Sequence, residues 1–259
     1  MPNTPNYIRR LILERALATK NNGAHIAPSL SIVEIMYVLF NLIMKNSHDN
    51  RRDRVILSKG HGALGMYAAM YAAGLINQSD FESFEVNGGA FPGQPSKNPA
   101  KGIEYSGGSL GLGLSYAIGL NLSKEGKQHG FRTYTILGDG ELNEGSVWEA
   151  AMFAGYQKLN NVAAIVDYNR MQSDGFTDDI LSFDIAGMWK ACGWEVVICD
   201  GHDTEALKKA LLTQTNKPLA VIAQTIKGKG VSFMENNREW HHGRLSEKQF
   251  ALATAELGE

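Results

Sequence analysis

The sequence has little cysteine, little proline, almost no excess of charge and no long uninterrupted hydrophobic run. Only two of its 259 residues are cysteines, Cys192 and Cys199, and they form neither a C-x-x-C pair nor a zinc-ligand pattern. They predict buried free thiols in a reducing compartment, which excludes the disulfide-stabilised secreted classes. The net charge of −2 gives no electrostatic reason to expect nucleic acid or an acidic membrane surface as a partner.

No segment has the pattern of a membrane span or a signal peptide. Residues 1–20 lack the apolar core of a signal sequence. The longest apolar stretch, GALGMYAAMYAAGLI at 62–76, is too short and too rich in small residues to cross a bilayer, and it is more typical of a buried helix. We therefore expect a cytoplasmic protein without a membrane partner.

Apolar periodicity predicts one α/β domain over residues 1–259. Strands that are apolar on both faces alternate with helical patterns, which is typical of a mostly parallel twisted sheet with helices on both faces. Ser31 and Glu34 have the spacing of a capping box at the start of one helix. Predicted helices cover 7–20, 31–44, 62–74, 146–158, 184–191 and 204–213, and predicted strands cover 54–58, 134–138, 162–168, 194–200 and 219–225.

A Gly-, Pro- and Ser-rich segment at 86–110 is too long to be a simple connector. Loops of this length inside a compact chain are often functional. We therefore expect this segment to contribute to a site.

Two oxygen-bearing side chains follow two consecutive predicted strands. Asp139 lies in Gly138-Asp-Gly140, directly after 134–138, and Asn169 directly follows 162–168. In open parallel sheets ligands bind beyond the carboxyl ends of the strands, so neighbouring strands would bring both side chains into one crevice.

Carboxylate and amide oxygens suit Mg²⁺ or Ca²⁺, and a Mg²⁺ ion held by two protein oxygens usually completes its shell with water and phosphate. Gly138 and Gly140 would let backbone N–H groups approach that phosphate. The alternative, an ordinary Gly-Asp-Gly turn and a helix cap at Asn169, stays open on these residues alone.

Four histidines in Gly- or Pro-bearing loops, His25, His61, His241 and His242, indicate a site that handles protons or phosphate oxygens. His61 follows the strand at 54–58 and should face the same crevice.

The remaining polar candidates are more ambiguous. Lys227 and Lys229, after the last strand, fit either phosphate contact or a solvated turn. His202 precedes a helix that Asp203 would cap, which favours a structural role. His48 and His129 lie in polar stretches, and both are predicted to be solvated.

Taken together, these motifs resemble the thiamine-diphosphate-binding family, and within it the amino-terminal half of transketolases. Gly-Asp-Gly is followed about thirty residues later by Asn, and eight segments have counterparts in the same order. They are GAHIAPSLSIVEI, LSKGHGALGMYAAM, FPGQPSKNPAKGIEYSGGSLGLGLSYAIG, GDGELNEGSVWEAAMFAG, DYNRMQSDG, CDGHD, TIKGKGVSFME and WHHG. The resemblance implies a diphosphate-domain fold and transfer of a two-carbon ketol (glycolyl) unit from a ketose to an aldehyde through thiamine diphosphate.

The resemblance also assigns roles to individual residues. It implies that the divalent ion is bound by Asp139, Asn169 and the carbonyl of Met171. It implies that the cofactor is contacted by His61, Gly108, Leu110, Gly138, Asp139, Gly140, Glu141, Asn169, Lys227 and His242. Catalytic roles would fall to His25 in the substrate channel, His61, His242, Gln94 and Glu144, the last in a carboxylate network between active sites.

Two residues depart from the family pattern. Gln94 stands in FPGQPS where the family has histidine, and Leu112 stands in SLGLG where glutamine is usual. Glutamine forms hydrogen bonds but cannot titrate, so a proton-relay role at this position is in doubt. We therefore expect an altered donor or acceptor sugar.

No segment matches the pyrimidine-binding domain of a full-length transketolase. We therefore expect a separate carboxy-terminal partner chain, assembly into a heterotetramer with two copies of each chain, and sugar or sugar-phosphate substrates. The alternatives are a subunit that decarboxylates or ligates 2-oxo acids, a 1-deoxyxylulose-5-phosphate synthase, and an inactive cofactor-binding half.

Overall fold

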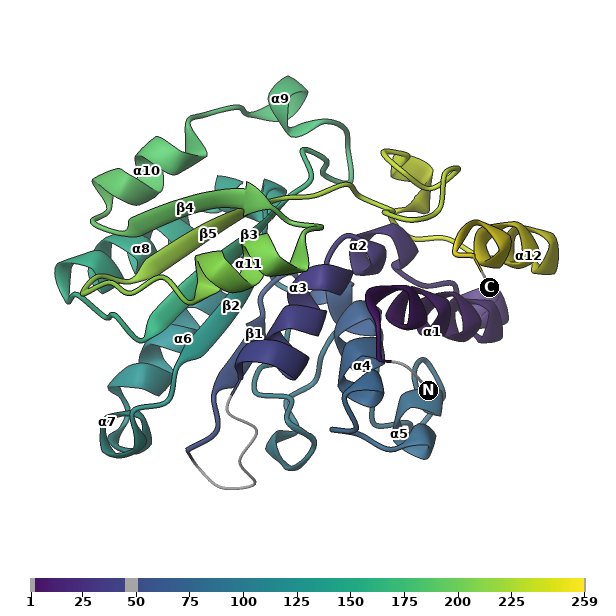
Figure 1. Ribbon diagram of the computed structural model, residues 1–259, viewed down its shortest axis with the longest axis horizontal. Helices are drawn as coiled ribbons and strands as arrows, with labels where there is room; N and C mark the ends of the chain where they lie inside the picture. The colour runs from purple at the N-terminus through teal and green to yellow at the C-terminus, as the bar shows by residue number, and fades with distance from the viewer. Residues whose placement is uncertain (1–2, 45–50, 259) are drawn as a thin grey trace.

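The computed structural model describes residues 3–44 and 51–258, and its centre is a five-stranded parallel sheet in the order β1-β2-β3-β5-β4 (Figure 1). Each predicted strand is confirmed to within a residue at either end. The strands are β1 (Arg54–Leu57), β2 (Thr133–Gly138), β3 (Val162–Tyr168), β4 (Glu195–Asp200) and β5 (Leu219–Gln224).

Strands β2 and β3 are hydrogen-bonded neighbours, and Gly138 pairs with Asp167 in their register. The residues that follow both strands therefore leave the sheet at the same edge. Strand β4 departs from the prediction of a strand buried on both faces. It lies at the edge of the sheet, where Ile198 is 55% exposed.

Helices cover both faces of the sheet (Figure 1). One face is covered by α1 (Pro5–Ala18), α2 (Ile26–Leu30), α3 (Val33–Val38), α4 (Ala63–Ala72) and α11 (Thr204–Leu211). The other is covered by α6 (Gly113–Leu122), α8 (Gly145–Tyr156) and α10 (Ile185–Ala191). The remaining helices are α5 (Gln78–Glu82), α7 (Lys124–His129), α9 (Thr177–Ile180) and α12 (Glu247–Glu256).

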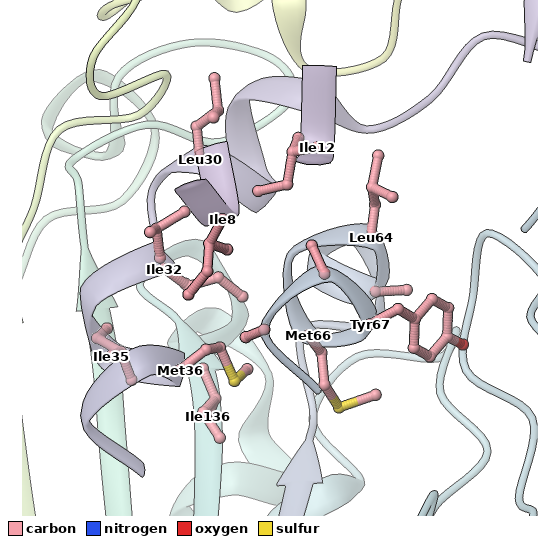
Figure 2. Close-up of a cluster of buried hydrophobic side chains, with 14 of the residues drawn as sticks. Ile8, Ile12, Leu30, Ile32, Ile35, Met36, Leu64, Met66, Tyr67 and Ile136 are labelled. Atoms are coloured by element: carbon pink, nitrogen blue, oxygen red, sulfur yellow. The ribbon is translucent and has the colours of Figure 1, made fainter. Parts of the chain in front are cut away.

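Two hydrophobic clusters fill the space between the sheet and its helices. Along β2 and β3 alternate side chains enter opposite clusters: Ile136 and Ile165 pack with α1–α4, and Leu137 and Val166 pack with α6 and α8. Figure 2 shows the first cluster. Its labelled members, all buried, are Ile8, Ile12, Leu30, Ile32, Ile35, Met36, Leu64, Met66, Tyr67 and Ile136.

The predicted helix at 31–44 is divided, and its capping box is wrong. Helix α3 begins at Val33 without a side-chain cap, and a π-helical turn follows at Leu39–Ile43. The Ser31 hydroxyl donates instead to Asp167 at 2.7 Å, and Glu34 accepts a hydrogen bond from Arg9. Both side chains are buried, and these long-range partners replace the local cap.

Several smaller predictions meet mixed outcomes. Residues 86–110 form an irregular loop with one short 3-10 turn, Pro99–Lys101. Cys192 and Cys199 are free thiols but only half-buried. His48 lies outside the described residues, and His129 is half-buried rather than fully solvated. Across residues 3–44 and 51–258, none of the helices has the length and apolar character of a membrane span.

The contact between α8 and the end of α10 predicts an effect on stability. A Cβ on Gly155 would lie 1.7 Å from the Cys192 carbonyl oxygen, so Gly155→Ala must separate two backbones. We expect the free energy of unfolding in urea to fall by about 2–3 kcal/mol. The control is Gly119→Ala in α6, where a Cβ meets nothing within 4 Å and should add about 0.5–1 kcal/mol. Equal stability of the two variants would contradict this packing.

Candidate functional site

A cavity opens at the carboxyl edge of the sheet, where β1, β2 and β3 end. It contains most of the predicted cofactor-binding residues. It is lined by Pro28, Lys59, His61, Leu110, Gly138, Asp139, Gly140, Glu141, Asn169, Met171, Gln172, Ser173, Lys227 and His241. The structure thus brings together the residues after separate strands, as the rule for parallel sheets predicts.

Asp139 presents a buried carboxylate to this cavity. Its side chain is held in place by two backbone donors, Gly140 N–H at 2.8 Å and Arg170 N–H. Arg170 has the left-handed φ of 61°, and its guanidinium lies over the Tyr168 ring rather than in an ion pair with the carboxylate. Within residues 3–44 and 51–258, no Lys, Arg or His side chain forms an ion pair with Asp139.

Burial is the main cause of the raised pKa of Asp139. Burial, helped by the neighbouring Asp167 carboxylate, raises the pKa of Asp139 to about 7, although the two backbone N–H groups oppose the shift. The Lys59 charge also opposes the shift but does not cancel it. A buried carboxylate without an ion-pair partner among the described residues favours a bound cation.

Asn169 lies next to Asp139 with its amide orientation fixed. Its Nδ2 donates to Asp167 at 3.1 Å and to the Ser31 hydroxyl at 3.2 Å, and its Oδ1 accepts from Met171 N–H at 3.0 Å. Because both hydrogens of Nδ2 are donated within the protein, the oxygen is the atom that remains for a ligand.

A buried ion pair between Lys59 and Asp167 forms the floor of the site. Lys59 is 1% exposed and Asp167 is fully buried. Burial alone would raise the pKa of Asp167, but the Lys59 ammonium outweighs it and, with the Thr225 and Ser31 hydroxyls, holds that pKa below its ordinary value. Sequence reasoning missed both residues, although each is a charged residue at the end of an apolar strand.

Lys227 reaches the same cavity from the loop after β5. It is 2% exposed, and its ammonium donates to the Gln172 carbonyl at 3.2 Å and to His241 Nδ1 at 3.0 Å. That contact leaves the His241 proton on Nε2. Burial, with the Lys59 charge, lowers the pKa of Lys227 to about 8. Of the two interpretations of Lys227, the solvated turn is therefore wrong.

The four loop histidines gather into one cluster. His25 has its ring centroid 4.6 Å from that of His242, 5.4 Å from that of His241 and 6.1 Å from that of His61. Burial, with nearby positive groups, lowers the pKa of His25 to about 4, that of His241 to about 3, and that of His61 well below its ordinary value. These three imidazoles are neutral at physiological pH, so each can donate through one nitrogen and accept through the other.

The structure lines the cavity with His241 rather than with His242, the residue for which the resemblance implies a contact with the diphosphate. His242 is exposed and packs on His25 and beside Gly23. A backbone bridge between Ala24 and Gly243 holds this segment against the chain, and successive side chains along it point in different directions.

Glu141 lines the cavity, but its carboxylate is used by the protein. It accepts from the Ser58 hydroxyl, from Gly111 N–H at 2.8 Å and from Gly138 N–H at 3.1 Å, and burial raises its pKa. Glu141 therefore fixes the glycine loops around the site.

The remaining predicted residues lie at different distances from the cavity. Leu110 lines it, whereas Glu144 is exposed beyond its lining at the start of α8. Gly108, with φ +135°, lies beside Gly60 just outside the lining. Gln94 packs on the same Gly60 with its Oε1 buried and without a hydrogen-bond partner. Leu112 is 47% exposed at the start of α6.

Gln172 is a further residue that sequence reasoning missed. It lines the cavity, packs against Gly140, and has a buried Nε2 with no hydrogen-bond partner in the part of the chain that the structure describes. Its closeness to Asn169 in the chain was the only available signal. An unsatisfied N–H donor inside a cavity that also holds Lys227 favours an anionic ligand.

Comparison with known proteins gives one consistent result. The family model described as "Transketolase, thiamine diphosphate binding domain" matches residues 3–259. The chain is 39% identical to the 6-deoxy-6-sulfo-D-fructose transketolase subunit SqwG of a Clostridium species, with 97% of this chain and 94% of that protein covered. It is also 39% identical to one of the subunits of the apulose-4-phosphate transketolase of Actinobacillus succinogenes, with 91% and 88% covered.

A solved structure agrees with these sequence relatives. Transketolase from Leishmania mexicana superposes with a TM-score of 0.86 at 26% identity, over 98% of this chain and 41% of that one. The chain thus spans nearly all of the subunit relatives but about two fifths of this solved transketolase.

The unpaired carboxylate of Asp139 predicts a dependence of stability on pH. An aspartate has an ordinary pKa of 3.8, so the folded chain holds this proton more tightly than the unfolded chain does. The resulting destabilisation is complete above pH 7 and is lost as the pH falls through 7 toward 3.8. Without divalent cation, the unfolding free energy of the wild type relative to Asp139→Asn should therefore rise by about 2–3 kcal/mol from pH 8 to pH 5. The exposed Asp179→Asn is the matched control, and a flat difference for Asp139→Asn would refute the electrostatic account.

Proposed function

Because the chain belongs to the transketolase family and carries its thiamine-diphosphate-binding domain, we propose that it is the amino-terminal subunit of an enzyme that transfers a two-carbon ketol unit from a ketose to an aldehyde. One observation carries the proposal: the buried, unpaired Asp139 carboxylate and the buried Lys227 ammonium line one cavity. Neither the Asp139 carboxylate nor the Lys227 ammonium forms an ion pair within residues 3–44 and 51–258, and a cavity with both groups suits a divalent cation together with a diphosphate.

The residues present fit a magnesium ion. Among the described residues the Asp139 carboxylate has two backbone N–H partners, and the Asn169 amide is oriented with its oxygen available. In this proposal the ion is held by Asp139, Asn169 and the Met171 carbonyl, with diphosphate and water completing its shell. These are hard oxygen ligands, which suit Mg²⁺ or Ca²⁺ rather than zinc.

The diphosphate would be held by the charge and the hydrogen-bond donors that line the cavity, with Lys227 exchanging its contacts to the Met171 and Gln172 carbonyls for phosphate oxygens. Lys227 supplies charge, and the Gln172 amide supplies a buried N–H without a partner. His241 donates through Nε2, and His61 lies 5.3 Å from it, measured between ring centroids. The backbone N–H groups around Gly138 and Gly140 line the same side, while Leu110 would contact the ring portion of the cofactor.

Proton transfer to and from the sugar hydroxyls would fall to the histidine cluster. Bound thiamine diphosphate supplies the carbon nucleophile and stores the electron pair left when the carbon–carbon bond breaks. His25 is neutral and lies between His61, His241 and His242, so it can accept a proton through one nitrogen while donating through the other.

The donor sugar is expected to be specialised. The relatives of similar length are named for 6-deoxy-6-sulfo-D-fructose and for apulose 4-phosphate. In this chain Gln94 stands where the family has histidine, with its Oε1 buried beside Gly60, and a glutamine cannot transfer a proton.

The proposal includes a second chain. Residues 1–259 form one diphosphate-binding domain, and a separate carboxy-terminal subunit supplies the pyrimidine-binding domain in an assembly of two copies of each. Two relatives named as subunits support this. Glu144 is exposed at the start of α8, which suits a contact with another chain. The free thiols agree with a cytoplasmic location.

Reconstitution tests the function. Co-expression with the chain encoded next to this reading frame should give a complex that transfers a two-carbon unit from one of a panel of ketoses, while this chain alone should be inactive. Asp139→Ala should lower the activity of the complex by more than about a hundredfold, because the metal site contributes several kcal/mol. The exposed Asp179→Ala is the control. Full activity of the single chain, or an active Asp139→Ala complex, would refute the assignment.

The charge of Lys227 predicts that the cofactor binds more weakly at alkaline pH. A bound diphosphate favours the charged ammonium, so in complex the pKa of Lys227 should rise from about 8. The Kd for thiamine diphosphate in saturating Mg²⁺ should therefore increase about tenfold per pH unit above pH 8 in the wild type. Lys227→Met should bind about 10–100-fold more weakly at pH 7, and its Kd should no longer rise with pH above pH 8. Calorimetric titration of the full chain measures both Kd values. If the Kd of the variant rises with pH as in the wild type, Lys227 does not contact the diphosphate.

A further inference from the structure

Three buried polar side chains outside the cavity lining form one continuous hydrogen-bonded chain. Arg9 of α1 donates to Glu34 Oε1 of α3 at 2.6 Å, and His202, just before α11, has its Nδ1 2.9 Å from Glu34 Oε2. Their side chains are only 5%, 6% and 12% exposed. Burying groups this polar costs free energy unless they are hydrogen-bonded to one another, as these three are.

The tautomer of His202 is determined by its two contacts. The backbone N–H of Ile226 donates to His202 Nε2 at 2.8 Å, so that nitrogen carries the lone pair. The proton must then lie on Nδ1, where it is donated to the Glu34 carboxylate. Glu34 thus decides which nitrogen of His202 can accept from the loop.

Both ends of this chain bind the backbone of the loop after β5. At one end His202 accepts from Ile226 N–H, and at the other Arg9 Nε donates to the Lys229 carbonyl at 3.0 Å. Arg9 also packs against Gly230, where a Cβ would lie 2.8 Å from its Nε. The two anchor points bracket Lys227, one residue before it and two residues after it.

We propose that Arg9, Glu34 and His202 are positioning residues that hold the 226–230 loop so that Lys227 enters the cavity. The proposal rests on the proposed function, in which Lys227 contacts the diphosphate. Two further backbone bonds steady the loop, from Gly228 N–H to the Ala27 carbonyl at 3.1 Å and from Asn236 N–H to the Lys227 carbonyl at 2.9 Å. The loop therefore stays folded, though loosened, when one anchor is removed.

Glu34→Gln is the sharpest substitution because it changes no volume. An amide cannot accept from both Arg9 and His202, and an amide N–H facing His202 moves the imidazole proton to Nε2, where it opposes Ile226 N–H. We expect the Kd of the full chain for thiamine diphosphate with Mg²⁺ to rise about three- to tenfold. The ¹⁵N chemical shifts of His202 should report the change of tautomer. Unchanged affinity in a folded Glu34→Gln chain would overturn the proposal.

A double-mutant cycle separates positioning from general destabilisation. If Glu34 acts through Lys227, adding Glu34→Gln to Lys227→Met should weaken binding no further than Lys227→Met alone. Independent, multiplying factors would overturn positioning while leaving the proposed function intact. No effect of Lys227→Met would instead remove the diphosphate role itself, and the positioning proposal with it.

Two comparisons distinguish a loss of positioning from a general loss of stability. Asp203 caps α11 beside His202 by accepting from Glu205 N–H and Ala206 N–H, so Asp203→Ala should lower stability without changing the Kd. Should Glu34→Gln not fold, His202→Leu against His202→Gln makes the same test, because the glutamine oxygen can still accept from Ile226 N–H. His202→Gln should bind the cofactor more tightly than His202→Leu, and equal Kd values for the pair would refute the proposal.

Discussion

The buried ion pair between Lys59 and Asp167 is the interaction on which the rest of the site depends. Asp167 accepts hydrogen bonds from four side chains that belong to different parts of the chain: Lys59, Ser31, Asn169 and Thr225. The carboxylate therefore joins the end of β1, the start of α3, the end of β3 and the end of β5 at one point. Because it is fully buried, removing either charged partner would leave the other uncompensated, at a cost of about 3–5 kcal/mol.

This ion pair also determines the chemistry above it. The side-chain amide of Asn169 donates both of its hydrogens to Asp167 and Ser31, so its oxygen points away from the ion pair. Burial is the largest cause of the pKa shifts around the cavity, and the ion pair adds to them: the Asp167 charge further raises the pKa of Asp139, and the Lys59 charge further lowers the pKa values of Lys227, His25, His61 and His241. The ion pair thus contributes to the raised pKa of one carboxyl group and to the neutral state of three imidazoles.

The sequence was sufficient for the sheet, the family and the position of the site, because these follow from local patterns. Apolar runs marked the strands, and the strand-end rule brought Asp139 and Asn169 together. Local spacing failed where a distant partner took over, as when Ser31 bonded to Asp167, 136 residues away, in place of a helix cap. Adjacent positions were equally hard to separate: only the folded backbone decides that His241 lines the cavity and His242 does not. The glutamate of Gly-Glu-Leu-Asn, Glu141, could not be recognised as a brace because its partners at Ser58 and Gly111 lie far away along the chain.

The cavity lining runs from Pro28 to His241, nearly the full described length of the chain. During synthesis on a ribosome, the strands that carry Asp139 and Asn169 emerge long before Lys227 and His241. The floor is also closed late, because Thr225 is the last residue to bond to Asp167. The cavity of a nascent chain therefore lacks two of its lining side chains until the segment up to His241 has left the exit tunnel, and its assembly is one of the late steps of folding.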